Sequence, residues 1–168
     1  QEAGYRGVVT VLDSSYEAAY KWYSGSAYVL CAALAPNNID LAVASVNETG
    51  GLVQFLRTDS ETVGPVFSTD GSLILDLCFV SDNILAAVGE SAVYFLNSSG
   101  TLLAQYDFGD GYLQTFSADG DGFLTLFISA DRSGLSGCLL TLDTQGNVIA
   151  ELPIESEILH MSAAGRYI

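Results

Sequence analysis

The chain has 168 residues, of which 49% are apolar and 15% are charged, a composition typical of one folded domain with a hydrophobic core. Twenty acidic residues against five basic ones give a formal net charge of −15, which disfavours nucleic acid and anionic lipid surfaces as partners. No apolar stretch approaches the roughly 18 residues that a membrane-spanning helix needs, so we expect no direct membrane insertion of this segment.

Residues 5–26, the first element, are predicted to form two β-strands joined by a turn. The apolar run VVTVLD at residues 8–13 begins a pattern that returns later in the chain. Aromatic side chains are concentrated here, which suits a recognition surface but suits packing between sheets equally well. These aromatic residues are Tyr5, Tyr16, Tyr20, Trp22 and Tyr23, and Tyr28 follows shortly after the element.

Residues 28–72 are predicted to form the first complete unit, with four short strands that we name a, b, c and d. Strand a contains the sequence VLCA, strand b begins at Ile39, and strand c is LVQFLR. A proline and two asparagines between a and b are residue types that favour turns. Apolar runs with turns at this spacing predict strands and leave no room for an ordinary helix.

Residues 73–111 and residues 112–156 repeat the same four strands. The c-type sequences AVYFLN and CLLTLD match VVTVLD and LVQFLR, and the a-type sequences ILDL and LQTF match VLCA. The repeat period is about 40 to 46 residues, as in four-stranded propeller blades. Several series of strands that share one period are hard to obtain by chance.

Residues 157–168 are predicted to begin a further unit, with ILHM at residues 158–161 as its strand a, followed by the start of strand b. The chain is therefore expected to be cut in mid-blade at both ends. His160 falls on this innermost strand, where a histidine is more often a core or channel residue than a functional one.

The predicted fold class is all-β. Residues 1–168 are expected to form a single β-propeller domain or segment of about four four-stranded antiparallel blades. A sandwich or a barrel is the alternative, although neither requires a period of this length. The ring could close with four blades, or the segment could belong to a seven- or eight-bladed ring.

Candidate sites in the sequence all have simpler structural explanations. The sequence DGDG at residues 119–122 begins like a calcium loop, but the later glutamate is missing and every unit has an a–b turn here. The sequence SGLSG at residues 133–137 lacks the spacing of a serine nucleophile elbow, and only His160 could act as its base. We therefore assign no catalytic, cofactor-binding or metal-binding residues, and the ligand-binding residues stay unassigned.

Three cysteines, Cys31, Cys78 and Cys138, lie in apolar strands without any Cys-x-x-Cys pairing. A zinc site needs clustered soft ligands, which one histidine and three separated cysteines do not provide. We expect all three thiols to be reduced and buried, and we predict no cofactor.

Two sequences point to a family: LDTQGNV at residues 142–148, which ends a blade, and MSAAGRYI at residues 161–168. The repeat resembles WD40-like and quinoprotein-like propellers, and it is still more similar to uncharacterised, membrane-anchored bacterial propeller proteins of unknown function. The resemblance implies an extracytoplasmic location, with anchoring through a segment not present in this chain. The Gly-His and Trp-Asp dipeptides of true WD40 blades are absent, and Trp22 alone does not make a quinone-binding pattern.

We expect a non-enzymatic binding or scaffold module, because propellers present loops on a rigid framework and serve many unrelated functions. The ligand would be a protein, a peptide or a glycan. One alternative is a carboxylate-dependent glycan hydrolase or lyase, since twenty acids offer many carboxylate pairs. Another is a structural self-assembly element, in which a homodimer completes a larger propeller ring.

Overall fold

The computed structural model describes residues 7–118 and 121–162, and the secondary structure of these residues is entirely β. Within these ranges there is no helix long and apolar enough to cross a membrane. The described strands are β1 (Val8–Leu12), β2 (Ala18–Tyr23), β3 (Tyr28–Leu34), β4 (Asp40–Asn47), β5 (Gly50–Arg57), β6 (Val66–Ser68), β7 (Ile74–Ser81), β8 (Ile84–Gly89), β9 (Ala92–Asn97), β10 (Leu102–Asp107), β11 (Tyr112–Ser117), β12 (Phe123–Ser129), β13 (Gly137–Asp143) and β14 (Val148–Ile154).

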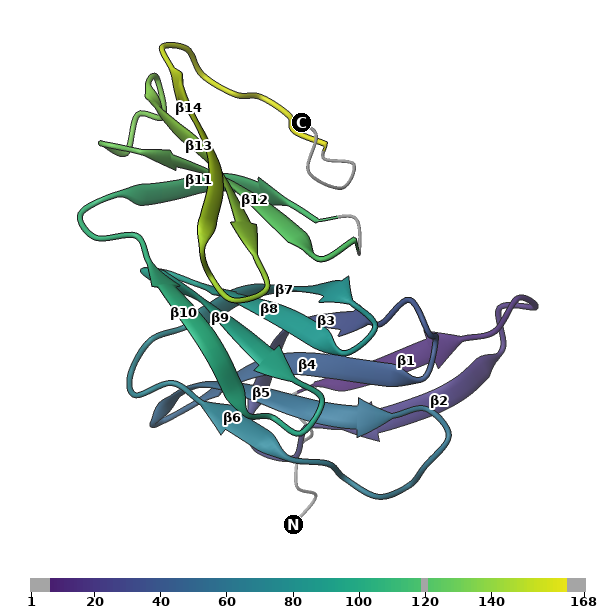
Figure 1. Cartoon of the computed structure of the whole chain (residues 1–168). Coiled ribbons are helices and arrows are strands. Elements are labelled where there is room, and N and C mark those ends of the chain that lie inside the picture. Colours follow the sequence, from purple (N-terminus) through teal and green to yellow (C-terminus); the bar gives the residue numbers. More distant parts are fainter. Residues whose placement is uncertain (1–6, 119–120, 163–168) are drawn as a thin grey trace.

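The described strands form antiparallel sheets, three with four strands and one with two (Figure 1). Strands β1 and β2 are half of a first blade, β3–β6 are the second blade, β7–β10 the third and β11–β14 the fourth. In each complete sheet the strands lie side by side in chain order. This confirms the predicted fold class, an all-β propeller segment built of four-stranded antiparallel blades.

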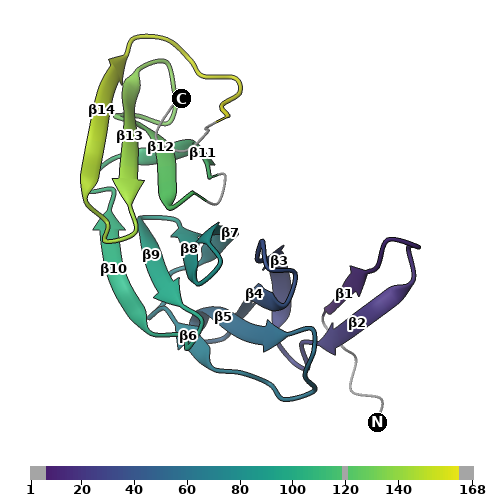
Figure 2. The same cartoon turned by 45° about the vertical axis from the view of Figure 1, so that its right-hand side comes forward.

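The blades follow one another around an open arc (Figure 2). Strands β3, β7 and β11 lie on the inner side of the arc, and β6, β10 and β14 lie on its outer side. These inner strands are the a strands of the sequence repeat, as expected. The arc is not closed into a ring by the described residues.

The inner strands share an irregularity. Each has a β-bulge against its neighbour at a corresponding place, between Val29 and Cys31, between Ile74 and Asp76, and between Leu113 and Thr115. A bulge increases the local twist and changes the direction of side chains. The repeat therefore extends to backbone detail beyond the order of the strands.

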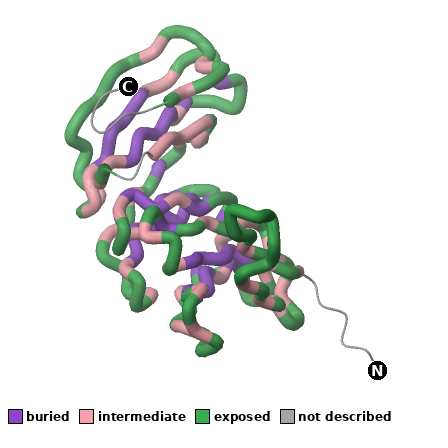
Figure 3. Tube along the Cα trace, turned by 90° about the vertical axis from the view of Figure 1, so that its right-hand side faces the viewer, coloured by how far each residue is buried: buried purple, intermediate pink, exposed green. Residues whose placement is uncertain are grey.

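Hydrophobic layers between successive blades hold the arc together. Middle strands of a propeller are covered on both faces, so they are apolar throughout rather than alternating. Figure 3 shows this burial along the middle of the blades, with exposed residues at their edges. Fully buried side chains on the b and c strands include Leu85, Phe95, Leu96, Leu124, Leu126, Phe127 and Leu142.

Each interface between blades has its own cluster. Phe55 and Phe79 belong to the cluster between the second and third blades. Phe95 and Leu124 belong to the cluster between the third and fourth blades. The half blade packs on the second blade through Trp22 and its neighbours, against strands β4 and β5.

The end of the described chain differs from the prediction. Residues 158–161, expected as an inner strand, form no strand, and Leu159 is 87% exposed. His160 is also exposed and does not lie on an inner strand. A strand needs a neighbour to satisfy its backbone hydrogen bonds, and the described residues supply none here. Residues 163–168, where the next strand b is expected to begin, lie outside the described residues.

Candidate functional site

The same tight turn joins strands c and d in the first, third and fourth blades. It starts at Asp13, Asn97 or Asp143, at the end of strand c. In each turn the Oδ1 atom of this residue accepts hydrogen bonds from the backbone N–H groups two and four residues later, at distances from 2.8 to 3.0 Å. An Asx side chain placed in this way fixes the turn.

In the second blade, Arg57 takes the place of this aspartate or asparagine. The sheet register shows the correspondence, because Arg57, Asn97 and Asp143 each pair with the first residue of strand b. A guanidinium group has no hydrogen-bond acceptor, so the same turn cannot form. The connection is instead a longer one, residues 58–65, which we call the β5–β6 loop.

The β5–β6 loop is anchored to strand β5 by a buried glutamine. The Nε2 atom of Gln54 donates hydrogen bonds to the carbonyl oxygens of Phe55 (3.0 Å), Gly64 (2.8 Å) and Pro65 (3.1 Å). The Gly64 N–H also donates to the Phe55 carbonyl at 3.1 Å, and the Phe55 N–H donates to the Pro65 carbonyl at 3.0 Å. These bonds tie residues 64–65 of the loop to strand β5, so the loop has a defined path.

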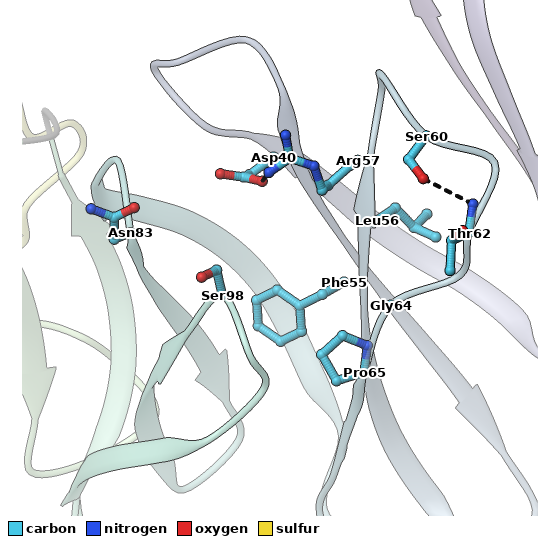
Figure 4. Close-up of a pocket in the computed structure, with 10 residues that line it drawn as sticks. All are labelled: Asp40, Phe55, Leu56, Arg57, Ser60, Thr62, Gly64, Pro65, Asn83 and Ser98. Carbon is cyan, nitrogen blue, oxygen red and sulfur yellow. Dashed lines mark hydrogen bonds and ion pairs between the residues drawn. The ribbon is translucent and has the colours of Figure 1, made fainter.

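The β5–β6 loop forms one wall of a cavity between the second and third blades, which we call the interblade cavity (Figure 4). Its volume is about 390 Å³. Phe55 and Pro65 form its apolar part, and they face Asn83 and Ser98 from the turns of the third blade. The other lining residues are Asp40, Leu56, Arg57, Ser60, Thr62 and Gly64.

A small charge network lies at the edge of the interblade cavity. Arg57 donates to both carboxylate oxygens of Asp59, from Nε at 3.0 Å and from Nη2 at 2.8 Å, and its Nη1 atom lies 3.4 Å from Asp40 Oδ1. The hydrogen bond with Asp59 raises the pKa of Arg57, and the same bond lowers the pKa of Asp59. Asn37 Nδ2 holds the other oxygen of Asp40 at 2.7 Å. Because Asp59 is kept ionised, it suits recognition of hydrogen-bond donors better than proton transfer.

The sequence candidates for calcium and serine chemistry are placed in loops. Asp121 and Gly122 lie in the turn before β12, and residues 119–120 are outside the described residues. Ser133 lies between β12 and β13, where its hydroxyl donates to Asp131. Nowhere in residues 7–118 or 121–162 do three or more His, Cys, Asp or Glu side chains form a group that could hold a metal ion.

The three cysteines are free and partly buried, so they are less buried than expected. Burial raises the pKa of Cys31 to about 12, and the nearby Asp76 carboxylate contributes to this shift. Burial and Asp76 also raise the pKa of Cys78 to about 12. Burial also raises the pKa of Cys138, and the hydrogen bond with Glu151 is the next largest cause of this rise. Thiols that stay protonated are weak nucleophiles, so these side chains fit packing better than catalysis.

None of the residues of the interblade cavity was predicted from the sequence as a site residue. Arg57 was included in the c-strand series, but its difference from Asp13, Asn97 and Asp143 was a usable signal. Where one unit of a repeat lacks the turn residue that the other units share, its connection is expected to differ from the common turn. No such signal identifies Asn83 or Ser98, which belong to ordinary turns.

No protein-family model matches the chain, and no curated protein matches its sequence. Solved structures do match. The structure titled "KlHsv2 with loop 6CD replaced by a Gly-Ser linker" has 16% identity and a TM-score of 0.61, covering 82% of this chain and 46% of that one. The WD40 domain of Pan2 from Neurospora crassa has 16% identity and a TM-score of 0.60, covering 96% and 47%.

A chain of a mitotic checkpoint complex is also similar, with 12% identity and a TM-score of 0.65, covering 96% of this chain and 53% of that one. The present chain therefore spans about half the length of each of these chains. At such low identity the likeness concerns the fold alone. Together with the repeated sheets, it shows that this chain has a WD40-like β-propeller fold in the form of an open arc.

Proposed function

We propose that this chain is part of a non-enzymatic, extracytoplasmic binding or scaffold module that takes a protein, peptide or glycan ligand at the interblade cavity. The WD40-like fold supports the general role, since such propellers serve as frameworks for interaction. The extracytoplasmic location, with anchoring through a segment outside this chain, rests on the resemblance of residues 142–148 and 161–168 to membrane-anchored bacterial propellers. It can be checked by protease accessibility of the full-length protein in intact cells.

The interblade cavity is the observation that carries this proposal. Phe55 and Pro65 provide an apolar surface for one side chain or sugar face. Around them, Asp40, Asn83 and Ser98 provide polar groups that can fix the orientation of a ligand. The walls come from two blades that pack through a hydrophobic cluster, so the cavity is formed before a ligand arrives.

The binding role can be tested with a random peptide library and a glycan array. Selected ligands should lose about tenfold or more in affinity for Ser98→Phe, because the new ring fills the cavity. Ser99→Phe is the matched control, since Ser99 is exposed in the same turn and does not line the cavity. Ligands that bind both variants as tightly as the original protein would contradict the proposed site.

The half blade supports a proposal about assembly. Strand β1 corresponds to β5, β9 and β13, each of which pairs with a b strand, whereas β1 pairs with β2 alone among the described strands. Val8 and Leu12 of β1 are 50% and 52% exposed. Open strand edges and exposed apolar residues favour association. We propose that a second copy supplies the missing strands, which gives a homodimer with a larger ring.

Sedimentation at micromolar concentration tests this assembly. The chain should sediment as a dimer, and Val8→Lys should convert it to a monomer near 17.7 kDa. Val66→Lys is the matched control, because Val66 has a similar exposure of 52% but lies on the outer strand of a complete blade. A monomer without any substitution would refute the homodimer and leave the binding proposal intact.

A further inference from the structure

The β5–β6 loop has a second hollow on its other side, toward strand β2. This hollow, which we call the β2 groove, has a volume of about 710 Å³. One wall consists of residues 19–23 of β2, and the other consists of residues 58–61 and Val63 of the loop. The groove does not share a lining with the interblade cavity except at Ser60.

The wall on β2 is a strand edge. Five consecutive residues line the groove, so it runs along most of the length of β2. Strand β2 pairs with β1 on one side, and no described strand pairs with its other side. An edge of this kind presents alternating N–H and C=O groups to which an extended peptide can add as a further strand.

The side chains of the groove combine aromatic and acidic groups. Tyr20 and Trp22 are half-buried, pack toward the second blade and belong to the lining of the groove. On the opposite wall, Asp59 is held by Arg57, and the exposed Glu61 makes no hydrogen bond or ion pair with the described residues. Aromatic faces attract cations and long aliphatic stems, and a carboxylate attracts the charged end.

The charges favour a basic ligand over an acidic one. Glu61 offers a carboxylate that no described partner neutralises, while Lys21 is the one cation among the described residues that line the groove. The net charge of −15 adds a long-range attraction for cations. Lys21 alternates with Tyr20 and Trp22 along β2, so its side chain starts from the opposite face of the strand.

We propose that the β2 groove binds an extended basic peptide, which adds as a strand to the open edge of β2. The stem of a lysine or arginine of the peptide lies along Trp22, and its charged end pairs with Glu61. An oligosaccharide would use the aromatic rings but would leave the backbone groups of the strand edge without matching partners. This inference goes beyond the proposed function, because it concerns another surface and does not require the interblade cavity.

Trp22 provides a direct measurement, because it is the only tryptophan in the chain. The whole chain is titrated with a blocked seven-residue peptide in which lysine alternates with valine, and Trp22 fluorescence is followed. We expect a saturable change that weakens as salt is raised. The same peptide with glutamate in place of lysine should not bind. A peptide N-methylated on alternate residues should lose at least about tenfold in affinity, because it cannot complete the strand pairing.

Matched variants separate the β2 groove from general charge effects. Glu61→Lys should weaken peptide binding about tenfold, and Lys21→Glu should strengthen it severalfold. Glu48→Lys, an equal charge change at an exposed turn outside the groove, should have little effect. Ser98→Phe should also leave this binding unchanged, which distinguishes it from binding at the interblade cavity.

Three outcomes would overturn the inference. The first is the absence of any saturable change in Trp22 fluorescence. The second is equal binding of the N-methylated peptide, which would exclude strand addition. The third is competition by a neutral oligosaccharide that binds more tightly than the peptide and is insensitive to Glu61→Lys.

Discussion

The tight c–d turns and the β5–β6 loop occupy equivalent positions in successive blades, but their backbone N–H and C=O groups find hydrogen-bond partners in different ways. In the turns, one aspartate or asparagine at the end of strand c accepts the bonds. In the second blade that residue is Arg57, which cannot accept these bonds. There, Gln54 instead donates hydrogen bonds to the backbone carbonyls of Gly64 and Pro65. The longer path leaves the loop as a wall of both the interblade cavity and the β2 groove. Both proposed binding surfaces thus lie beside the loop where the repeat is broken.

Gly64→Ala should have the largest effect on the β5–β6 loop. A Cβ atom at Gly64 would lie 2.6 Å from the backbone oxygen of Phe55, where the loop folds back on β5. We expect the free energy of unfolding to fall by up to about 3 kcal/mol, as measured by urea denaturation. Gly25→Ala is the control for a turn glycine with open space around it, and it should cost about 1 kcal/mol for its positive φ. A stable Gly64→Ala protein would mean that the loop takes another path.

Tyr16→Gly should stabilise the protein. Tyr16 has a φ of 63° at the turn position where the third and fourth blades have Gly100 and Gly146, with φ of 71° and 75°. Its side chain is 85% exposed, so little packing is lost on removal. We expect the free energy of unfolding to rise by about 1 kcal/mol, since a left-handed conformation costs a non-glycine residue about this much. Ser15→Gly in the same turn should give no gain, and a gain there of equal size would contradict the explanation.

Asn97→Ala should show that a tight turn depends on its side-chain acceptor. The substitution removes hydrogen bonds from the N–H groups of Ser99 (3.0 Å) and Thr101 (2.9 Å), and we expect a loss of about 1 kcal/mol. The corresponding variant of the loop, Arg57→Ala, should change the free energy of unfolding much less, because the Arg57 side chain is 54% exposed and its shorter ion pair, with Asp59, lies at the surface. Equal losses in denaturant unfolding would show that the turn and the loop are held in the same way.

The smallest effect concerns the pH dependence of Asp59. Its hydrogen bond with Arg57 lowers its pKa below the ordinary value of 3.8. The bond therefore stabilises the folded state at pH values above 3.8. This stabilisation is lost as the pH falls through the lower pKa that Asp59 has in the folded state. Carboxyl chemical shifts measured by NMR should show a titration below pH 3.8, and Arg57→Gln should move it back toward 3.8. An unchanged titration in this variant would mean that Arg57 does not lower the pKa of Asp59.

Much of the fold could be predicted from the sequence, because blades are local structures. Each blade is a run of consecutive antiparallel strands, so its apolar segments and turn residues lie close together in the chain. The Asx turns at Asn97 and Asp143 follow from hydrogen bonds over four residues at most. The failure at residues 158–161 has the same origin, since an apolar segment becomes a strand only where a neighbouring strand is present.

The strand order, the all-β class and the repeating blades can be predicted from the sequence, since these depend on periodicity and on short-range hydrogen bonds. The positions of the hollows depend instead on how the blades pack against one another. The interblade cavity forms because Ser98 of one blade is brought opposite Phe55 of the preceding blade by packing of the hydrophobic cluster between them. The β2 groove likewise needs the half blade to rest on the second blade. Such contacts join residues far apart in the chain, and no local pattern encodes them.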